Sequence, residues 1–222
     1  MTTAIIGVGE LGSRVARDLV SGGERVVLAA RDQSSADNLA RELGDLASSA
    51  PVADAVSSAD AVVLAVWLDT DKELIPQLSH ELVGEVVIDP SNPLMFDDHG
   101  GFARSLPDDE SAGSVVANLL PAGTHYVKAF GSMGADALGS AANREPERAV
   151  LFYATDDDTA AAAAERLIRV SGFDPVKVGG IEAAGRIEAP GGDLHQQSGL
   201  HGRLLNIDEA RAAAERLAES RG

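Results

Sequence analysis

The sequence contains no cysteine, and this absence removes several kinds of site at once. Without a thiol, the 222 residues can form no disulfide framework, no thiolate metal site and no cysteine nucleophile. The absence fits a reducing compartment, and we expect a cytoplasmic protein. No apolar run approaches the eighteen residues that a membrane-spanning helix needs, and no basic stretch leads into an apolar core as in a secretory signal. We therefore expect neither a membrane anchor nor a signal peptide.

Basic residues are scarce. Lys and Arg number 18 against 35 Asp and Glu, which gives a formal net charge of -17 at pH 7. A surface this acidic repels phosphate backbones, so we expect no nucleic-acid partner. The simplest interpretation is a solvated acidic surface that favours solubility, and a salt-tolerant host is an alternative. Any anionic small-molecule ligand must then be attracted by local positive potential.

Strands and helices are predicted to alternate through the first ninety residues. The pattern predicts strands at 3–8, 25–30, 61–66 and 86–89, with a short strand near 51–52. It predicts helices at 11–20, 34–43, 53–58 and 71–82, the last interrupted near Pro76. This alternation indicates an α/β protein with a Rossmann-type, doubly wound parallel sheet.

The alternation of strands and helices is less regular in the second half of the chain. We expect a polar, turn-rich loop over 95–110, a helix at 111–120, a strand at 126–130 and another loop over 131–147. A strand at 150–155, a helix at 159–170 and a short strand at 176–178 follow. A final helix is expected at 208–219. With 45% hydrophobic residues, the chain suits one domain over 1–180 with a small helical C-terminal extension over 181–222.

A glycine-rich stretch, IIGVGELGS, begins within the first predicted strand and leads into the first predicted helix. Gly7, Gly9 and Gly12, with Glu10 and Leu11 between them, give the spacing G-x-G-x-x-G. Alone the pattern fits a tight turn as well, but here it follows a strand and opens a helix within a βαβ unit. Gly7 would allow the turn, Gly9 would let the pyrophosphate approach, and Gly12 would let the helix pack closely on the sheet. We therefore predict a dinucleotide at the positive end of this helix.

The end of the second predicted strand indicates whether the dinucleotide is NAD or NADP. NAD-binding proteins usually carry an acidic residue there, but this strand ends in Ala30 and Arg31. Arg31 is placed to bind the 2′-phosphate of NADP, with the hydroxyls of Ser34 and Ser35 as further donors. Asp32 is the complication, because a shift of one or two residues would make it the NAD-type acid. Arg31 as an ordinary exposed arginine is the other alternative, and we predict NADP.

Several stretches resemble one family. GVGELGSRVARDLVSGGERVVLAAR, ADAVVLAVW, VVIDPSNPL and VKAF resemble the NADPH-dependent deazaflavin reductases, also called F-420-dependent NADP oxidoreductases. The resemblance extends over residues 3–188 and includes LIRVSGFDPVKVGGIEAAGRIE. It implies a Rossmann domain with a small C-terminal segment, a homodimer, and hydride transfer between NADPH and the deazaflavin coenzyme F-420.

The resemblance also implies further cofactor-binding residues. They lie at the carboxyl ends of the predicted strands, where ligands bind to parallel sheets. Val66 and Trp67 would lie beside the dinucleotide, although core packing is an alternative for Trp67. The other implied positions follow the two next strands: Pro90, Ser91, Asn92, Pro93, Ala129 and Phe130.

The tail departs from the family pattern. The stretch PGGDLHQQSGLHGRLLNIDEA contains His195 and His201, where the deazaflavin reductases carry a more apolar segment. No acidic or histidine partner at helical spacing supports a metal site, so we expect none and assign both histidines to loop or interface contacts.

The sequence offers no strong acid or base. Tyr126 and Lys128 lack the Tyr-x-x-x-Lys spacing of short-chain dehydrogenases. His125 is the candidate if a proton must be delivered, and a surface histidine is the alternative. Hydride transfer itself asks mainly that two rings be held together. The main hypothesis is an NADP-dependent oxidoreductase acting on a deazaflavin, and the alternatives are a reductase of a small carbonyl or imine compound and a non-catalytic NADP-binding redox sensor.

Overall fold

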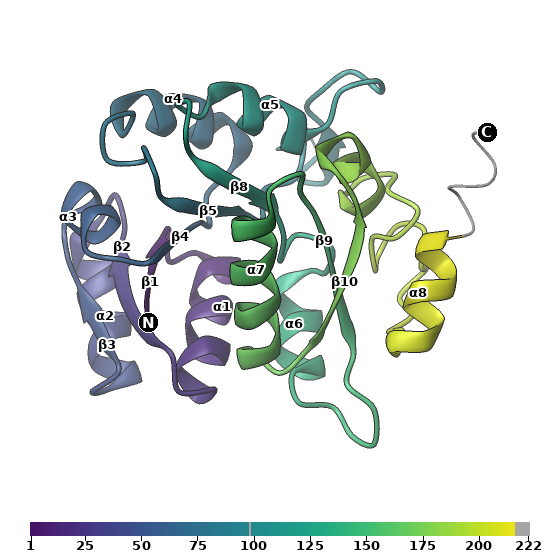
Figure 1. Cartoon of the computed structure of the whole chain (residues 1–222), viewed down its shortest axis with the longest axis horizontal. Helices are drawn as coiled ribbons and strands as arrows, with labels where there is room; N and C mark the ends of the chain where they lie inside the picture. Colours follow the sequence, from purple (N-terminus) through teal and green to yellow (C-terminus); the bar gives the residue numbers. More distant parts are fainter. Residues whose placement is uncertain (98, 216–222) are drawn as a thin grey trace.

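An eight-stranded sheet forms the centre of the protein (Figure 1). The computed structural model describes residues 1–97 and 99–215. In spatial order the strands are β10 (Asp174–Gly179), β9 (Val150–Ala154), β8 (His125–Lys128), β5 (Val86–Asp89), β4 (Ala61–Leu64), β1 (Thr2–Ile6), β2 (Arg25–Ala29) and β3 (Ala47–Ser49). The strands from β8 to β3 are parallel to one another, which confirms the predicted Rossmann-type α/β fold.

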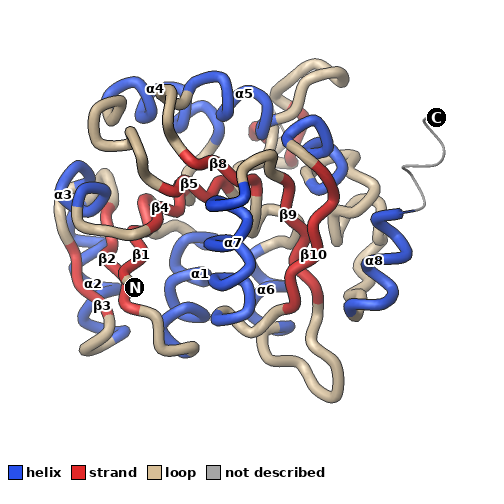
Figure 2. Tube along the Cα trace, in the orientation of Figure 1, coloured by secondary structure: helices blue, strands red, loops and turns tan. Residues whose placement is uncertain are grey.

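Helices cover both faces of the sheet (Figure 2). One face packs against α1 (Glu10–Ser21), α2 (Gln33–Leu43), α6 (Ala135–Ala141) and α7 (Asp158–Val170). The other packs against α3 (Val52–Ser57), α4 (Leu68–Gln77) and α5 (Ala112–Leu119). Strand residues contribute alternately to the two layers, as Ile5 and Ile6 of β1 do. Two apolar layers therefore hold the strands from both sides.

The last two strands run in the opposite direction. β9 pairs with β8 in antiparallel fashion, and β10 pairs with β9 in parallel through the crossover helix α7. Their outer face is covered by the C-terminal segment, which contains η1 (Ile181–Ile187) and α8 (Ile207–Glu215). Ile187, Leu194 and Leu205 form a third apolar cluster with β9 and β10. The division at residue 180 stays a prediction.

Some elements differ from those expected. The region predicted as a loop over 95–110 contains a hairpin of β6 (Leu94–Phe96) and β7 (Phe102–Arg104), and the loop over 131–147 contains α6. The strand expected near 51–52 is β3, a few residues earlier, and α4 begins and ends before the predicted 71–82. Residues 216–219 of the last predicted helix lie outside the described part. In the described residues, no helix combines the length and apolar character needed to cross a membrane.

Candidate functional site

The turn between β1 and α1 has the geometry of a phosphate-binding loop. Gly7 has a φ of 99°, and a Cβ there would lie 2.3 Å from the carbonyl oxygen of Ala65. A Cβ on Gly12 would lie 1.9 Å from the carbonyl oxygen of Gly7. A Cβ on Gly9 meets no atom within 4 Å, so the space beyond Gly9 is open. Two glycines are thus required by packing, while the third faces the space that a diphosphate would occupy at the helix N-terminus.

At the end of β2, Arg31 and Asp32 have different roles. Asp32 is the N-cap of α2, and its carboxylate accepts hydrogen bonds from the amide of Ser34 at 3.2 Å and from the hydroxyls of Ser34 and Ser35 at 2.8 and 2.9 Å. These bonds lower the pKa of Asp32 below its usual value. Arg31 is exposed and makes no ion pair or hydrogen bond with any residue that the structure describes.

This arrangement changes the expected role of the two serines. Both hydroxyls were predicted to donate to a 2′-phosphate, but in the structure both donate to Asp32. Capping competes with phosphate binding because each hydroxyl has a single proton to donate. Asp32 is likewise engaged with the end of its own helix. Arg31 remains as the cationic group at this strand end.

The segments that follow β4, β5 and β8 lie at the same edge as the glycine turn, because the carboxyl ends of parallel strands share one edge. Val66 is half-buried, whereas the indole-bearing Trp67 is 47% exposed and not part of the core. Pro90 and Ser91 are buried. Ala129 and Phe130 are also buried, so only their main chain is available to a ligand.

Asn92 connects three segments at this edge. Its side-chain amide donates to the carbonyl of Gly131 at 3.0 Å, and its side-chain oxygen accepts the amide of Ala189 at 2.7 Å. The first bond joins the segments after β5 and β8, and the second joins them to the C-terminal segment. Phe130 has a φ of 65°, an uncommon conformation for a large residue. The turn after β8 is therefore held in one conformation by its neighbours.

A buried polar network lies beneath this edge, and sequence reasoning missed it. The ammonium of Lys128 donates to Asp89 at 2.9 Å and to the carbonyl of Ser91, and it lies 3.6 Å from Glu188. The hydroxyl of Tyr126 donates to Asp89 at 2.7 Å. Burial lowers the pKa of Lys128, but Asp89 and Glu188 outweigh it and raise that pKa above its usual value. Lys128 is therefore a charged group that fixes the position of Ser91.

Glu188 extends the network into the C-terminal segment. Its carboxylate accepts the amides of Ala112 at 2.9 Å and Gly113 at 2.8 Å, which are the first two residues of α5. A carboxylate is favourable at a helix N-terminus because it satisfies amides that lack intrahelical partners. One buried side chain thus joins α5, β8 and the C-terminal segment.

Asp71 is the unusual member of this region. It lies fully buried in the first turn of α4, and neither carboxyl oxygen has a hydrogen-bond partner among the described residues. Burial, and then the charge of Asp89, raise the pKa of Asp71 to about 9. Asp71 is therefore neutral at pH 7, while Asp89 accepts the hydrogen bond from Lys128.

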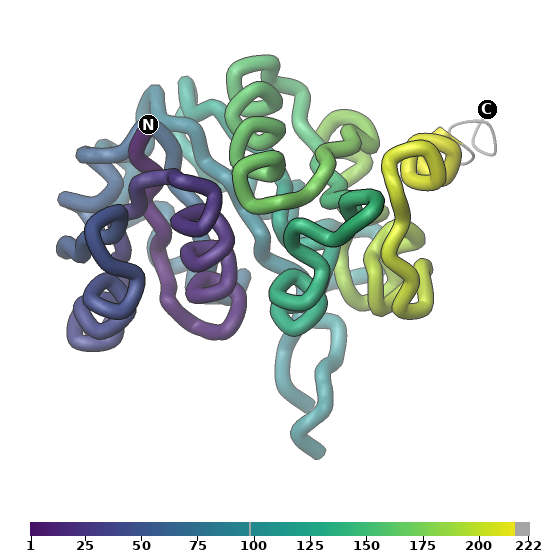
Figure 3. The backbone as a smooth tube through the Cα atoms, turned by 90° about the horizontal axis from the view of Figure 1, so that it is seen from below, coloured from purple at the N-terminus to yellow at the C-terminus, as the bar shows by residue number. Residues whose placement is uncertain are grey.

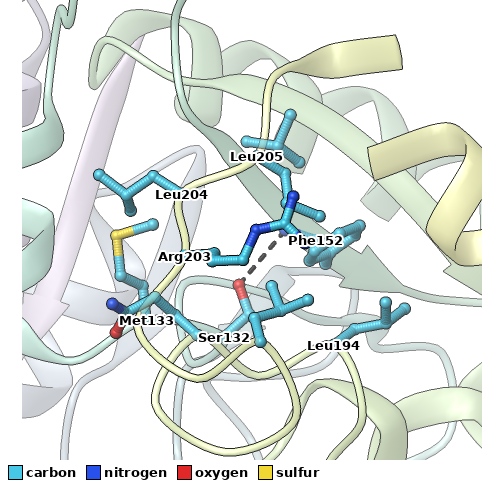
Figure 4. A pocket seen from close by; sticks show the side chains of 10 residues that line it. Ser132, Met133, Phe152, Leu194, Arg203, Leu204 and Leu205 are labelled. Atoms are coloured by element: carbon cyan, nitrogen blue, oxygen red, sulfur yellow. Dashed lines mark hydrogen bonds between the residues drawn. The ribbon is translucent and has the colours of Figure 1, made fainter. Parts of the chain in front are cut away.

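The C-terminal segment lies against the turn after β8. The amide of Gln196 donates to the carbonyl of Ser132 at 2.9 Å. His195 is buried, and burial lowers its pKa to about 4, so its ring is neutral at pH 7. His201 is exposed. Figure 4 shows a cavity of about 10 Å³ between this segment and β9, lined among others by Ser132, Phe152 and Leu194. The cavity holds about one water molecule and is no cofactor pocket.

His125 lies away from this edge. It is the first residue of β8, at the amino end of the strand, and its ring bonds Asp157 at 2.7 Å. Three strand residues, 126–128, separate it from the segment that follows Lys128, a distance of roughly 13 Å. The structure therefore does not bring the sequence-predicted proton donor to the predicted site.

Comparison with known proteins identifies a matching protein family and two curated relatives. Residues 2–93, from β1 to the segment after β5, match the family described as NADP oxidoreductase coenzyme F420-dependent. This N-terminal part is therefore similar to that family. The F420-dependent NADP reductase of Methanothermobacter thermautotrophicus is 28% identical over 199 residues, with 85% of both chains covered. The corresponding reductase of Methanothermobacter marburgensis is 27% identical, with 85% of this chain and 88% of the relative covered. The predicted resemblance and the predicted class, an NADP-dependent oxidoreductase, are confirmed.

Solved structures agree on the fold. A hypothetical protein of Sinorhizobium meliloti superposes with a TM-score of 0.80 at 29% identity, covering 94% of this chain and 96% of that protein. A protein of Arthrobacter sp., described as an F420-dependent NADP-reductase, has a TM-score of 0.71 at 22% identity, with 82% and 86% covered. Imine reductases superpose over about half of their own length, as one from Myxococcus stipitatus does with a TM-score of 0.56 at 19% identity and 55% coverage, and share the fold alone.

Proposed function

We propose that this protein transfers hydride between NADPH and a deazaflavin coenzyme of the F-420 type. The observation that carries the proposal is the β1–α1 turn with open space beyond Gly9, in a chain whose two curated relatives are F420-dependent NADP reductases. When bound, NADPH supplies a hydride from its dihydronicotinamide ring, and the reduced deazaflavin also takes up one proton from solvent. A homodimer remains an expectation.

The residues of the turn fit a dinucleotide. Gly9 leaves room for the pyrophosphate, and the first amides of α1 would donate to its oxygens. Gly7 and Gly12 hold the strand and the helix close enough to keep those amides in position. Glu10 and Leu11 lie in the first turn of the helix, beside the expected phosphates. This local positive end compensates for the acidic surface.

The end of β2 supports NADP as the dinucleotide. Arg31 is exposed and makes no ion pair among the described residues, so its guanidinium is available to a 2′-phosphate. Asp32 caps α2 and has its oxygens occupied by Ser34 and Ser35, so it is not free to bind ribose hydroxyls as the acid of an NAD-binding protein does.

The segments after β5 and β8 would hold the nicotinamide ring and the deazaflavin ring. Lys128 fixes Ser91 from below, and Asn92 ties the segments after β5 and β8 to Ala189. The fixed position of these segments matters because hydride transfer depends on the distance and orientation of the two rings. The C-terminal segment, which is joined to Asn92 through Ala189, would border the rings on one side and limit the access of water. These residues position the reactants and need not exchange protons with them.

The proposal is tested by following absorbance after mixing the protein with NADPH and a deazaflavin. We expect loss of the oxidised deazaflavin band together with NADPH oxidation in a one-to-one ratio. NADH in place of NADPH is the matched comparison and should support the reaction poorly. If deazaflavin is never reduced, while a panel of carbonyl or imine compounds supports NADPH oxidation, the assigned acceptor is wrong. If no acceptor supports oxidation, the redox-sensor alternative gains support.

A further inference from the structure

Three exposed aromatic rings gather at the carboxyl edge of the sheet. Trp67 is 47% exposed, Phe96 61% and Phe102 60%. Their ring centroids lie 5.4 Å apart for Trp67 and Phe96, 6.1 Å for Trp67 and Phe102, and 5.1 Å for Phe96 and Phe102. These distances are those of interacting aromatic pairs. We call this set of three residues the aromatic cluster.

The cluster is formed by segments that leave the cofactor edge directly. Trp67 is the N-cap of α4 and comes three residues after the end of β4. Phe96 and Phe102 belong to the β6–β7 hairpin, which begins next to Pro93. Figure 3 shows this hairpin projecting from the body of the protein. The cluster is therefore continuous with the segments after β4 and β5, which the proposed function places beside the nicotinamide.

The hairpin is held in place at its base. The amide of Ser105 donates to the carbonyl of Pro93 at 2.9 Å. The guanidinium of Arg104 donates to the carbonyl oxygens of Pro107 at 3.3 Å, Pro190 at 3.3 Å, and Glu110. The bond to Pro190 also ties the hairpin to the C-terminal segment. Fixed strands, rather than a collapsed loop, thus present Phe96 and Phe102 to solvent.

The distribution of exposed apolar side chains is one-sided. Of the six large ones among residues 1–97 and 99–215, four lie at this edge, namely the three rings and Met95, which is 49% exposed. The other two, Met1 and Val83, come just before β1 and β5 and so lie at the opposite edge of the sheet. Aromatic residues make up only 4% of the chain. An exposed aromatic patch at the edge where the proposed function places the cofactor indicates a binding surface.

We propose that Trp67, Phe96 and Phe102 form the surface on which the planar ring system of the hydride acceptor stacks. This inference rests on the proposed function, which requires a flat heteroaromatic ring next to the nicotinamide. Aromatic faces bind such rings by stacking and exclude water from them. The acceptor would lie between the nicotinamide, held after β4 and β5, and the rings of the cluster. A deazaflavin is the class of acceptor that fits, because a small carbonyl or imine compound offers no extended ring to stack.

The fluorescence of Trp67 provides a direct test, since it is the single tryptophan of the chain. Deazaflavin is titrated into the wild-type protein in the presence of NADP, with N-acetyltryptophanamide as the control for light absorption. We expect saturable quenching. In a double variant, Phe96→Ser with Phe102→Ser, the midpoint of the titration should rise roughly tenfold. Val83→Ser, at the opposite edge, is the matched control and should leave the midpoint unchanged.

Steady-state kinetics separate this inference from the proposed function. In the double variant the KM for deazaflavin should rise roughly tenfold, while the KM for NADPH stays within about twofold of wild type. An unchanged KM for deazaflavin in an active double variant overturns the stacking surface and leaves the proposed function intact. If the wild type does not reduce deazaflavin at all, the proposed function fails, and the fluorescence titration alone decides. Absence of quenching then overturns the surface too.

A second copy of the chain is the competing occupant. Sedimentation of the wild type and of the double variant distinguishes it from a small molecule. If the wild type is a dimer that the double substitution dissociates, and both KM values change with dissociation, the cluster is an interface between copies and the inference is overturned. An unchanged association state with a selective rise in the KM for deazaflavin supports the acceptor surface.

Discussion

At the scale of single residues, we propose that the choice between NADP and NAD depends on Arg31. A charge-assisted hydrogen bond to the 2′-phosphate contributes about 1.5–3 kcal/mol, so Arg31→Ala should weaken NADPH binding roughly 10- to 150-fold. NADH lacks this phosphate and should bind with nearly the same affinity to both proteins. Isothermal titration calorimetry with both cofactors measures the difference.

Asp32→Ala is the matched control. Because Asp32 caps α2, its loss should lower the free energy of unfolding by about 1 kcal/mol, without loss of NADH binding. The same change frees the hydroxyls of Ser34 and Ser35 and should leave NADPH binding equal or slightly tighter. The opposite result would be loss of NADH binding in Asp32→Ala together with unchanged NADPH affinity in Arg31→Ala. It would mean that Asp32 binds the ribose hydroxyls and that the cofactor is NAD.

Asp71 should make stability depend on pH. Its pKa is raised to about 9 in the folded protein, so between about pH 4 and 9 the folded state holds a proton that the unfolded state has released. Stability contributed by the neutral carboxyl is therefore complete below pH 4 and is lost as the pH rises through that window. Asp71→Asn stays neutral at every pH and should unfold at higher denaturant concentration than the wild type at pH 8.

Urea unfolding at a series of pH values from 5 to 9 measures this effect. The decline of the free energy of unfolding with rising pH should be shallower in Asp71→Asn than in the wild type. Exposed Asp45 offers a matched control, and Asp45→Asn should follow the wild-type curve. Parallel curves for Asp71→Asn and the wild type would show that Asp71 is ionised in the fold.

Sequence reasoning finds residues that act through a local pattern. The roles of Gly7 and Gly12 in packing follow from spacing alone, and the structure agrees with both. The contact between Lys128 and Glu188 has no such pattern, because sixty residues separate the two and each resembles an ordinary surface charge. The roles of Ser34 and Ser35 could not be predicted either, because their hydroxyls can bind either a phosphate or the N-cap carboxylate of Asp32. In the structure they bind Asp32.

At the scale of elements, the β1–α1 turn gives a matched pair of substitutions. In Gly9→Val the side chain enters open space, and Gly9 already has a φ of -65°, so the protein should fold and lose NADPH binding. In Gly12→Val the Cβ would lie 1.9 Å from the carbonyl oxygen of Gly7, so the helix must move and stability should fall by several kcal/mol, roughly 3 or more. Circular dichroism melts and cofactor titration report the two properties separately.

Two results would contradict the predictions for Gly9→Val and Gly12→Val. A folded Gly9→Val protein with unchanged NADPH affinity would show that no diphosphate approaches this turn. A Gly12→Val protein as stable as the wild type would show that the helix can retreat from the sheet without cost. Either result would remove the glycine spacing as evidence for the site.

Elements were predictable where apolar periodicity was strong. The strand Val86–Asp89 lies where it was predicted. Helix α1 extends one residue beyond the prediction at each end, and α7 begins one residue earlier than predicted. The β6–β7 hairpin was missed because its strands are three residues long and flanked by polar turn residues. Helix α6 was missed for a similar reason, since ADALGSA is short and contains a glycine. Packing against α1 stabilises such a helix, and packing is not visible in a local pattern.

At the scale of the whole molecule, the net charge of -17 should affect stability. Like charges repel one another in the compact state, and salt screens this repulsion. We expect the Tm at pH 7.5 to rise between 20 mM and 500 mM NaCl. Near the isoelectric point of about 4.5 the same addition should raise the Tm much less. Calorimetry at both pH values measures the effect, and a Tm that falls with salt at pH 7.5 would show that ion pairs dominate.

The direction of the last strands could not be predicted from the sequence. A parallel sheet was expected throughout, but β9 runs against β8. The connection between them, over residues 129–149, carries the short helix α6 rather than a full crossover back across the sheet. Both β8 and β9 are buried along almost their whole length and show no alternation of buried and exposed residues, so their relative direction depends on the connection between them.

This reversal leaves a seam in the sheet. Among the described residues, β8 and β9 pair at one position, Lys128 with Ala154, whereas β5 and β8 pair at four. Helix α7 bridges the seam by packing on strands from both sides, and its Arg166 bonds Glu24 at 2.7 Å. In amide hydrogen exchange, β9 and β10 should therefore open as a cooperative unit of lower free energy than β1, β4 and β5. If the acceptor binds beside the C-terminal segment as proposed, β9 and β10 can open around it while the strands of the proposed dinucleotide site stay paired.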